Sequence, residues 1–88
     1  MEFEFDQKKS ASNLKKHGID FATAQRLWTD FRRVVVPAWS STEPRHALIG
    51  ELNKKLWTCI FTVRRERIRI ISVRRSRDEE EKGYYYQG

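Results

Sequence analysis

The stretch from Arg64 to Arg77 constrains the fold most, because it combines the pattern of a β-strand with a high density of positive charge. Seven of its fourteen residues are arginine, while isoleucine and valine occupy its centre. Branched side chains in alternation with long ones favour a strand over residues 67–74, with Ile68 and Ile70 on the face opposite the arginines. The sequence therefore predicts a half-buried strand whose outer face is cationic.

The residues after this strand predict a helix. Ser76 and Glu79 have the three-residue spacing of a capping box, in which two side chains bind backbone amides at a helix start. The acidic run Asp78–Glu81 also suits a first turn, because the helix dipole favours negative charge there. We therefore expect a short C-terminal helix at the end of the strand, and arginines next to a helix start form a candidate phosphate site.

The size and charge of the chain limit its partners. With 88 residues it should form one domain, 1–88, that buries about 60–65% of its unfolded surface. The net charge is +6, and residues 1–77 carry 17 lysines and arginines against eight acidic residues, a surplus of nine positive charges. Nucleic acid is the polyanion that such a surface favours. An anionic membrane surface, an acidic protein partner, or charge that serves only solubility are the alternatives.

Several classes of protein do not fit the sequence. No segment reaches the roughly 18 apolar residues of a membrane span, and the N-terminus lacks a signal-peptide pattern, so we expect a cytoplasmic protein that does not enter a membrane. The one cysteine, Cys59, excludes an internal disulfide and is expected in the core. The two histidines lack the spacing of a zinc site, and no carboxylate cluster suggests a divalent metal. We expect neither a metal nor another cofactor.

The first third of the chain predicts two helices. Asp6 can cap a helix over residues 7–17 that Gly18 ends, and the lysines of this helix form either a solvated face or a contact with RNA. Asp20 can cap a second helix over residues 21–30, where large apolar side chains recur at helical spacing. We expect this second helix to cover a sheet.

From residue 32 onward the periodicity is that of strands, interrupted by polar turns. Strand patterns occupy residues 34–36, 45–52, 55–63 and 67–74, and residues 2–5 alternate like a short edge strand. The predicted fold class is therefore α+β, with two N-terminal helices packed on a strongly twisted antiparallel sheet and a short C-terminal helix.

The register of the last strands follows from keeping apolar residues on one face. A two-residue turn at Arg65–Glu66 pairs Val63 with Ile68, Phe61 with Ile70, and Cys59 with Ser72. A second turn at Asn53–Lys54 pairs His46 with Phe61, which makes His46 a core residue instead of a base. The opposite face then collects four arginines: Arg45, Arg64, Arg67 and Arg69. They form either a phosphate-binding face or a screened surface ladder, in which like charges on neighbouring strands repel.

Two segments in this order are specific enough to indicate a family: Lys16-His17-Gly18-Ile19-Asp20-Phe21 and Arg67-Ile68-Arg69-Ile70-Ile71-Ser72-Val73-Arg74-Arg75. Further matching residues, which extend the likeness over nearly the whole chain, include Phe5-Asp6, Asn13-Leu14 and Glu43-Pro44-Arg45. On these residues the chain resembles the BrnT family of type II toxins, which belong to the wider RelE-like ribonucleases. It departs from them at Arg65, where glycine is usual in the last hairpin, and at Glu81, where a basic residue often stands.

The resemblance implies a RelE-like fold, ribonuclease activity that inhibits translation, and neutralisation by a BrnA-like antitoxin. It also implies that operator DNA is bound only through that antitoxin. Tyr84 lies where the family's late tyrosine falls. The alternative function is that of a noncatalytic basic module that binds nucleic acid.

RNA cleavage without a metal needs a base for the 2′-hydroxyl, an acid for the leaving oxygen and cations around the transition state. Guanidinium groups can supply the cations, since they fork onto phosphate oxygens. For proton transfer the candidates are His17, Tyr84 and the lysines, although His17 could instead cap its helix. The candidate catalytic residues are Arg45, Arg64, Arg69, Arg74, His17 and Tyr84, and the candidate RNA-binding residues are Arg67, Arg75 and Lys16. The predicted reaction is attack by the 2′-hydroxyl, which leaves a 2′,3′-cyclic phosphate or 3′-phosphate end.

Overall fold

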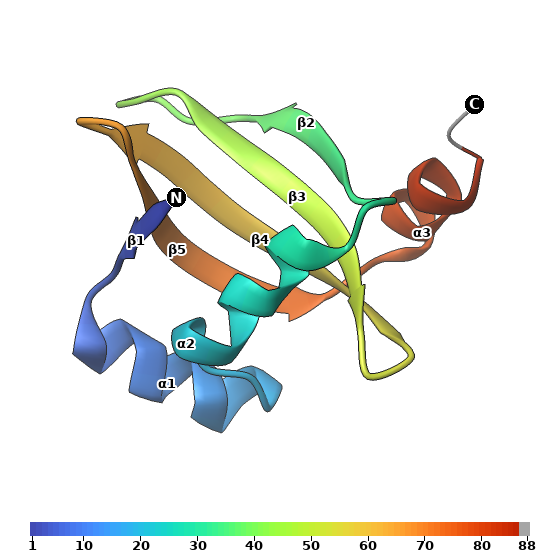
Figure 1. Cartoon of the computed structure of the whole chain (residues 1–88), viewed down its shortest axis with the longest axis horizontal. Coiled ribbons are helices and arrows are strands. Elements are labelled where there is room, and N and C mark those ends of the chain that lie inside the picture. Colours follow the sequence, from blue (N-terminus) through green and yellow to red (C-terminus); the bar gives the residue numbers. More distant parts are fainter. Residues whose placement is uncertain (87–88) are drawn as a thin grey trace.

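The computed structural model describes residues 1–86 and has an α+β fold, in which helices lie on both sides of one sheet (Figure 1). In chain order its elements are β1 (Glu2–Glu4), α1 (Gln7–His17), α2 (Phe21–Ala24), the 3₁₀ helix η1 (Gln25–Thr29), β2 (Val34–Ala38), β3 (Arg45–Leu52), β4 (Lys55–Arg64), β5 (Arg67–Arg75) and α3 (Asp78–Tyr85). The strand order is β1-β5-β4-β3-β2. No helix in the described part of the chain is long and apolar enough to cross a membrane.

The sheet is mixed, so the expectation of a purely antiparallel sheet is wrong. The three pairs that join β2 to β5 are antiparallel, but β1 pairs parallel with β5. A parallel pair needs a long connection between its strands, and here the whole helix layer and three strands intervene. The three-residue β1 covers only the first part of the β5 edge and places Glu2 beside Arg67 and Glu4 beside Arg69.

Both predicted two-residue turns are confirmed. Asn53 and Lys54 have φ values of 54° and 64°, and Arg65 and Glu66 have values of 50° and 67°. Positive φ at both central positions is the conformation that joins tightly paired antiparallel strands. Arg65 adopts it although glycine would do so with less strain. The pairs that these turns predict near the hairpin ends are present: Val63 with Ile68, Phe61 with Ile70, and His46 with Phe61.

A β-bulge at Ile71 changes the second half of β5. Phe61 pairs with Ile70, but the next residue of β4, Ile60, pairs with Ser72. The predicted pair of Cys59 with Ser72 is therefore wrong, because Ile71 is an extra, unpaired residue and Cys59 pairs with Val73. The bulge turns Val73 into the core and puts Arg74 on the same face of the sheet as Arg69.

The side chain of Asn13 in α1 acts as a substitute partner for β5 beyond the end of β1. Its Nδ2 donates to the carbonyl oxygen of Val73 at 2.8 Å, and its Oδ1 accepts from the Val73 amide at 3.1 Å. The same Nδ2 donates to the Ile19 carbonyl at 2.8 Å. A buried asparagine thus joins α1, the loop after it and the edge of β5.

The N-terminal helices form as the capping residues predict, and the second one ends early. Asp6 accepts hydrogen bonds from the amides of Lys8 and Lys9, and Asp20 accepts one from the Thr23 amide. The α-helical part after Asp20 stops at Ala24, however, and continues to residue 29 as a 3₁₀ helix. Its backbone lies close to β3, since a Cβ on Gly50 would be 3.3 Å from the Leu27 carbonyl oxygen. The prediction of one α-helix over residues 21–30 is therefore correct only for its first turn.

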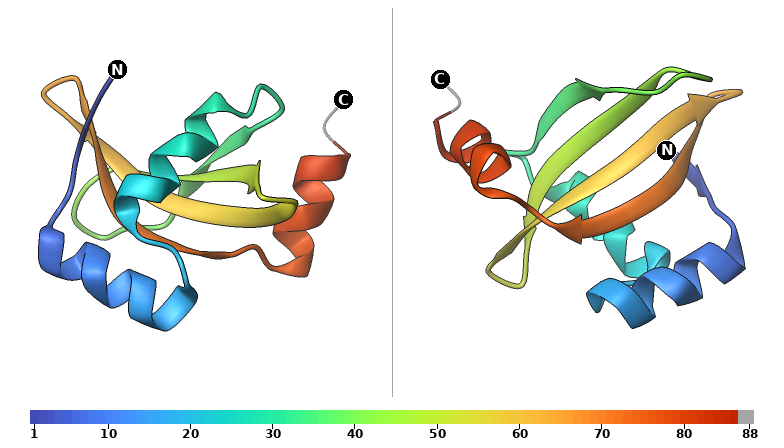
Figure 2. Two further views of the ribbon diagram at one scale, coloured as in Figure 1. Left: turned by 60° about the horizontal axis from the view of Figure 1, so that its bottom comes forward. Right: turned by 180° about the vertical axis from the view of Figure 1, so that it is seen from behind.

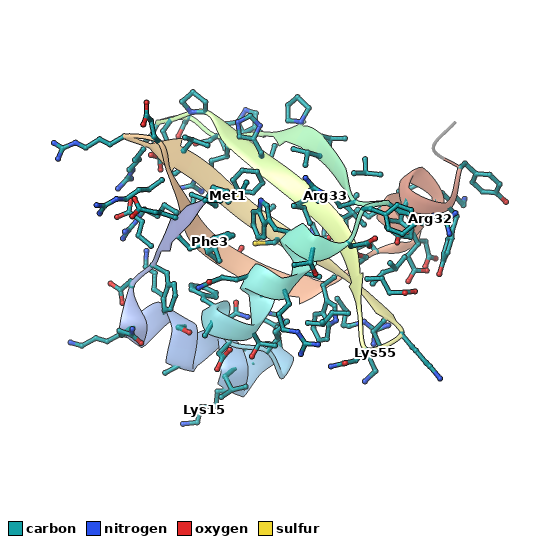
Figure 3. The ribbon with its side chains drawn as sticks, viewed as in Figure 1. Met1, Phe3, Lys15, Arg32, Arg33 and Lys55 are labelled. Carbon is teal, nitrogen blue, oxygen red and sulfur yellow. The ribbon has the colours of Figure 1, made fainter. Side chains whose placement is uncertain are left out.

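The main core lies between β3–β5 and the layer formed by α1, α2 and η1, on what we call the inner face of the sheet (Figure 2). Its fully buried residues include Phe21, Leu27, Leu48, Cys59 and Val73. Cys59 is a core residue as predicted, and burial raises the pKa of its thiol. Phe3 of β1 extends this core by packing edge-on against Trp28, with ring centroids 5.0 Å apart, whereas Lys15 projects from α1 away from the sheet (Figure 3).

A second apolar cluster lies on the opposite, outer face, where α3 covers one end of the sheet. Tyr84 packs there against Ile49, Leu56 and Val34. The capping box at the start of α3 is shifted by one residue from its predicted place: Glu80 accepts the Arg77 amide at 2.8 Å. Ser76 cannot cap the helix because its hydroxyl bonds to the Thr58 hydroxyl at 2.8 Å and its amide to the Leu56 carbonyl.

Candidate functional site

The outer face of the sheet carries four arginines at the end away from α3, as the register predicts. Arg64 pairs across the hairpin with Arg67, Arg69 pairs with Thr62, and Arg45 begins the neighbouring strand β3. We call the four residues Arg45, Arg64, Arg67 and Arg69 the arginine face. A shallow hollow of about 450 Å³ lies here, lined by Glu4, Arg64, Arg65, Arg67 and Arg69. In the view from behind in Figure 2, no helix of the described residues crosses this part of the sheet.

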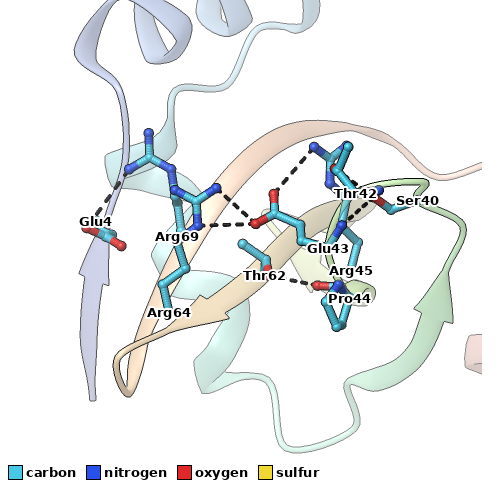
Figure 4. A network of polar contacts seen from close by, with 9 residues as sticks. All are labelled: Glu4, Ser40, Thr42, Glu43, Pro44, Arg45, Thr62, Arg64 and Arg69. Carbon is cyan, nitrogen blue, oxygen red and sulfur yellow. Dashed lines mark hydrogen bonds and ion pairs between the residues drawn. The ribbon is translucent and has the colours of Figure 1, made fainter.

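Glu43 lies between two of these arginines and was not among the predicted site residues. Its Oε1 accepts from Nε and Nη2 of Arg64, at 3.2 and 2.9 Å, and its Oε2 lies 3.6 Å from Nη2 of Arg45 (Figure 4). The hydrogen bond from Arg64 holds the pKa of the Glu43 carboxyl below its ordinary value. The buried Nε of Arg45 has no hydrogen-bond partner among the described residues.

The other two arginines also face carboxylates. Glu2 lies 3.3 Å from Arg67, and Glu4 lies 3.9 Å from Arg69. The parallel register of β1 explains both pairs, because it sets Glu2 and Glu4 directly beside these arginines. The arginine face is thus partly screened by its own acids, and the alternation Glu2-Phe3-Glu4 was the signal in the sequence that could have indicated it.

Two partly buried hydrogen bonds fix the loop that presents Glu43. Thr62, which is 2% exposed, points to the outer face from near the end of β4 and donates its hydroxyl to the Pro44 carbonyl at 2.7 Å. On the other side, the Ser40 hydroxyl accepts the Glu43 amide at 3.4 Å. These contacts hold the loop before β3 against the end of β4, so that the carboxylate of Glu43 lies against Arg64 (Figure 4).

Arg74 is on the outer face, but the structure does not bring it to the arginine face. It pairs with Thr58, four residues along β4 from Thr62, which corresponds to roughly 13 Å. Its Nη1 and Nη2 donate to Glu80 at 2.8 and 2.9 Å, and the two side chains are only 26% and 22% exposed. The bond from Arg74 lowers the pKa of Glu80 to about 2. This ion pair fastens the first turn of α3 to the sheet.

Arg75 and Tyr84 also lie outside the arginine face. The Arg75 side chain is on the inner face, with its guanidinium carbon 5.6 Å from the centre of the Trp57 ring. Tyr84 is 5% exposed beneath α3, and its hydroxyl donates to Oδ2 of Asp30 at 2.7 Å. Burial and this carboxylate together raise the pKa of the Tyr84 hydroxyl to about 12.

His17 and Lys16 line a separate hollow of about 230 Å³ at the edge of β5. It lies beside the bulge, and its lining also includes Lys9, Ile71 and Ser72. His17 itself is exposed at the last residue of α1. His46 is a half-buried residue that packs against Phe61, with ring centroids 5.3 Å apart, in agreement with its predicted inner-face position. The described residues hold no group of three or more His, Cys, Asp or Glu side chains arranged for a metal.

The arginine face combines four guanidinium groups, each paired with a carboxylate, with an open, shallow surface, an arrangement that suits the phosphates of an extended polyanion. The family model described as the ribonuclease toxin, BrnT, of type II toxin–antitoxin systems matches residues 5–80, and thus includes all four arginines and Glu43 but not Tyr84. No curated protein matches the chain. The family match covers most of the chain, and the protein therefore belongs to the BrnT family of type II toxin–antitoxin ribonuclease toxins.

Proposed function

We propose that the protein is a metal-independent endoribonuclease of RelE-like type, which folds as a single domain and inhibits translation by cleaving RNA in the cytoplasm. The observation that supports this most is the clustering of Arg64 and Arg69 at an open hollow on the outer face, with Arg45 joined to Arg64 through Glu43. Cleavage of a phosphodiester places additional negative charge on the phosphate oxygens in the transition state. Guanidinium groups that are already positioned can stabilise that charge without reorganising.

In this proposal the arginines differ in their tasks. Arg64 and Arg69, which line the hollow, bind the phosphate at the cleaved bond, and Arg45 assists from β3. Arg67, which also lines the hollow, holds a neighbouring phosphate. Lys16 and His17 lie at the second hollow beside Ser72, where they can contact a further part of the same RNA strand.

The location of Arg74 and Tyr84 favours structural tasks for them. The guanidinium of Arg74 is held by Glu80, and the hydroxyl of Tyr84 is held by Asp30. Arg75 lies over Trp57 on the other side of the sheet. Of the sequence-predicted site, we therefore retain Arg45, Arg64 and Arg69 as the catalytic cations.

The toxin family implies an antitoxin protein as a partner. We propose a BrnA-like antitoxin that places acidic groups on the arginine face and so excludes RNA, and that carries the operator-DNA contact of the complex. Opposite charges across such an interface favour rapid association that weakens with salt. Co-expression with this antitoxin should restore growth, and the complex should protect RNA from cleavage.

The reaction class can be tested with RNA and with the same strand carrying a 2′-deoxy sugar at the cleaved position, both in excess chelator. The proposal predicts cleavage of the RNA with many turnovers, a 2′,3′-cyclic phosphate end, and no cleavage of the deoxy strand. A noncatalytic binding module would retain both strands uncut. Cleavage of the deoxy strand, or loss of all activity with chelator, would contradict the mechanism.

A further inference from the structure

Glu43 is the acidic side chain that the fold holds most firmly within the arginine face. Its carboxylate has contacts with Arg64 and Arg45, and its backbone is fixed on both sides through Ser40 and through the Thr62 bond to Pro44. Glu4, the acid that lines the hollow, has an ion pair with Arg69 at 3.9 Å. A carboxylate in the middle of a phosphate-binding surface repels the substrate, so its rigid placement there calls for a chemical reason.

Attack by a 2′-hydroxyl needs a proton acceptor within reach of the same phosphate that the arginines hold. Glu4 is also near the arginines but contacts Arg69 only, at 3.9 Å, and the tyrosine and histidines singled out in the sequence are not placed for this. Tyr84 is buried and bonded to Asp30, His46 packs on Phe61 on the inner face, and His17 lines a different hollow. Glu43 directly contacts two of the arginines that would bind the phosphate.

We propose that Glu43 is the general base of the cleavage reaction, an inference that rests on the proposed function. As the 2′-oxygen forms its bond to phosphorus, its proton passes to the Glu43 carboxylate. The bond between phosphorus and the 5′-oxygen breaks, and the 5′-oxygen takes a proton from solvent. Glu43 then returns its proton to solvent, so that the enzyme regains its starting state.

The electrostatics of the site suit this task. In the free protein the hydrogen bond from Arg64 lowers the pKa of Glu43, which ensures that the carboxylate is unprotonated but makes it a weak base. A bound phosphate takes over donors of Arg64 and Arg45 and adds a nearby negative charge, and both effects raise the pKa of Glu43. The carboxylate therefore becomes more basic when the substrate is present, which moves its pKa toward the range that favours general-base catalysis.

The test compares Glu43→Gln with Glu2→Gln, its matched control. Each change removes one carboxylate that pairs with an arginine of the face, but Glu43 contacts two of the proposed catalytic arginines, whereas Glu2 contacts Arg67. Single-turnover cleavage should fall roughly 10²–10⁴-fold in Glu43→Gln and stay near the wild-type rate in Glu2→Gln. Binding of an uncleavable 2′-deoxy strand, measured by fluorescence anisotropy, should be equal or tighter in Glu43→Gln, because a repulsive charge is lost.

A base also leaves two signatures that a purely structural residue does not. The acid limb of the wild-type kcat profile should lie at higher pH than that of kcat/KM, since only kcat reports the complex with bound phosphate. Formate should restore part of the cleavage in Glu43→Ala, because it can occupy the vacated position and accept the proton. If Glu43→Gln loses thermal stability, formate rescue of Glu43→Ala still tests the general base at a temperature where Glu43→Ala is folded.

The possible outcomes distinguish failure of the general base from failure of the proposed function. Wild-type cleavage with Glu43→Gln at a similar rate overturns the base and leaves the arginine site standing. Weaker RNA binding in Glu43→Gln with unchanged kcat makes Glu43 a positioning residue for Arg64 instead. Absence of RNA cleavage by the wild-type protein overturns the proposed function and the base together.

Discussion

Asn13 joins the first helix to the last strand, and its replacement should be among the most destabilising single changes in the chain. In Asn13→Ala the amide and carbonyl of Val73 and the carbonyl of Ile19 lose their partners, three hydrogen bonds of 2.8–3.1 Å in a buried position. At about 0.5–1.5 kcal/mol for each bond, and more where a buried group stays unpaired, the free energy of unfolding should fall by roughly 2–5 kcal/mol. That is a large fraction of the roughly 5–15 kcal/mol by which domains are stable.

Asn13→Asp provides a sharper form of this test. The carboxylate can still accept the Val73 amide, but its second oxygen faces two carbonyl oxygens where Nδ2 donated. This environment raises the pKa of the new aspartate above its unfolded value of ~3.9. The stability of Asn13→Asp relative to the wild type should therefore be greatest below pH ~3.9, where the protonated aspartate can donate a hydrogen bond. This stability should be lost as pH rises through the raised pKa of the folded state.

The assay is urea denaturation followed by circular dichroism, with Ser12→Ala as the control because Ser12 is exposed on the same helix. The control should change the free energy of unfolding by no more than about 0.5 kcal/mol. The reasoning is refuted if Asn13→Ala costs less than about 1 kcal/mol, or if the stability of Asn13→Asp follows that of the wild type at every pH.

Three further predictions concern α3 and the arginine face. Glu80→Gln should lower the free energy of unfolding by about 1–3 kcal/mol at neutral pH, because Arg74 loses its charged partner. In the wild type the pKa of Glu80 is lowered from 4.5 to about 2, so its contribution to stability is complete above pH 4.5 and is lost as pH falls toward 2. Unfolding measurements of both proteins over this acid range check the prediction. Tyr84→Phe should lower the free energy of unfolding by about 1–2 kcal/mol, since Asp30 loses the donor at 2.7 Å, and thermal melts that coincide with the wild type would contradict this. Arg69→Lys should cleave RNA more slowly than the wild type in single-turnover assays, because an ammonium group cannot reproduce the bidentate fork, and an unchanged rate would show that only the charge matters.

The local parts of the fold could be predicted from the sequence. Asp6, Asp20 and Gly18 bound the first helices through short-range capping bonds, and the period of two fixes which faces meet near each hairpin turn. The position of the four arginines on one face follows from that register alone. For this reason the arginine face could be predicted without a structure.

The remaining parts depend on contacts between distant residues. The bulge at Ile71 is stabilised by Asn13, 60 residues from Val73, so nothing within β5 itself indicates the change of face. The partner of β1 and the place of Glu43 follow from packing of the whole sheet, and a glutamate in a polar turn looks like any solvated residue. The ion pair between Arg74 and Glu80 likewise could not be predicted without the position of α3.

The central claim is that the arginine face performs the cleavage, and the most direct measurement compares Arg69→Ala with Arg26→Ala. Arg26 is exposed on η1, in the layer that covers the inner face of the sheet. Arg26→Ala therefore removes an equal charge on the side of the sheet opposite the hollow. With one RNA in single-turnover assays, Arg69→Ala should lose roughly 10²–10³-fold in rate, as expected for one transition-state donor, while Arg26→Ala keeps the wild-type rate. Circular dichroism should show both variants folded. Full activity in Arg69→Ala, or an equal loss in both variants, would contradict the assignment of the site.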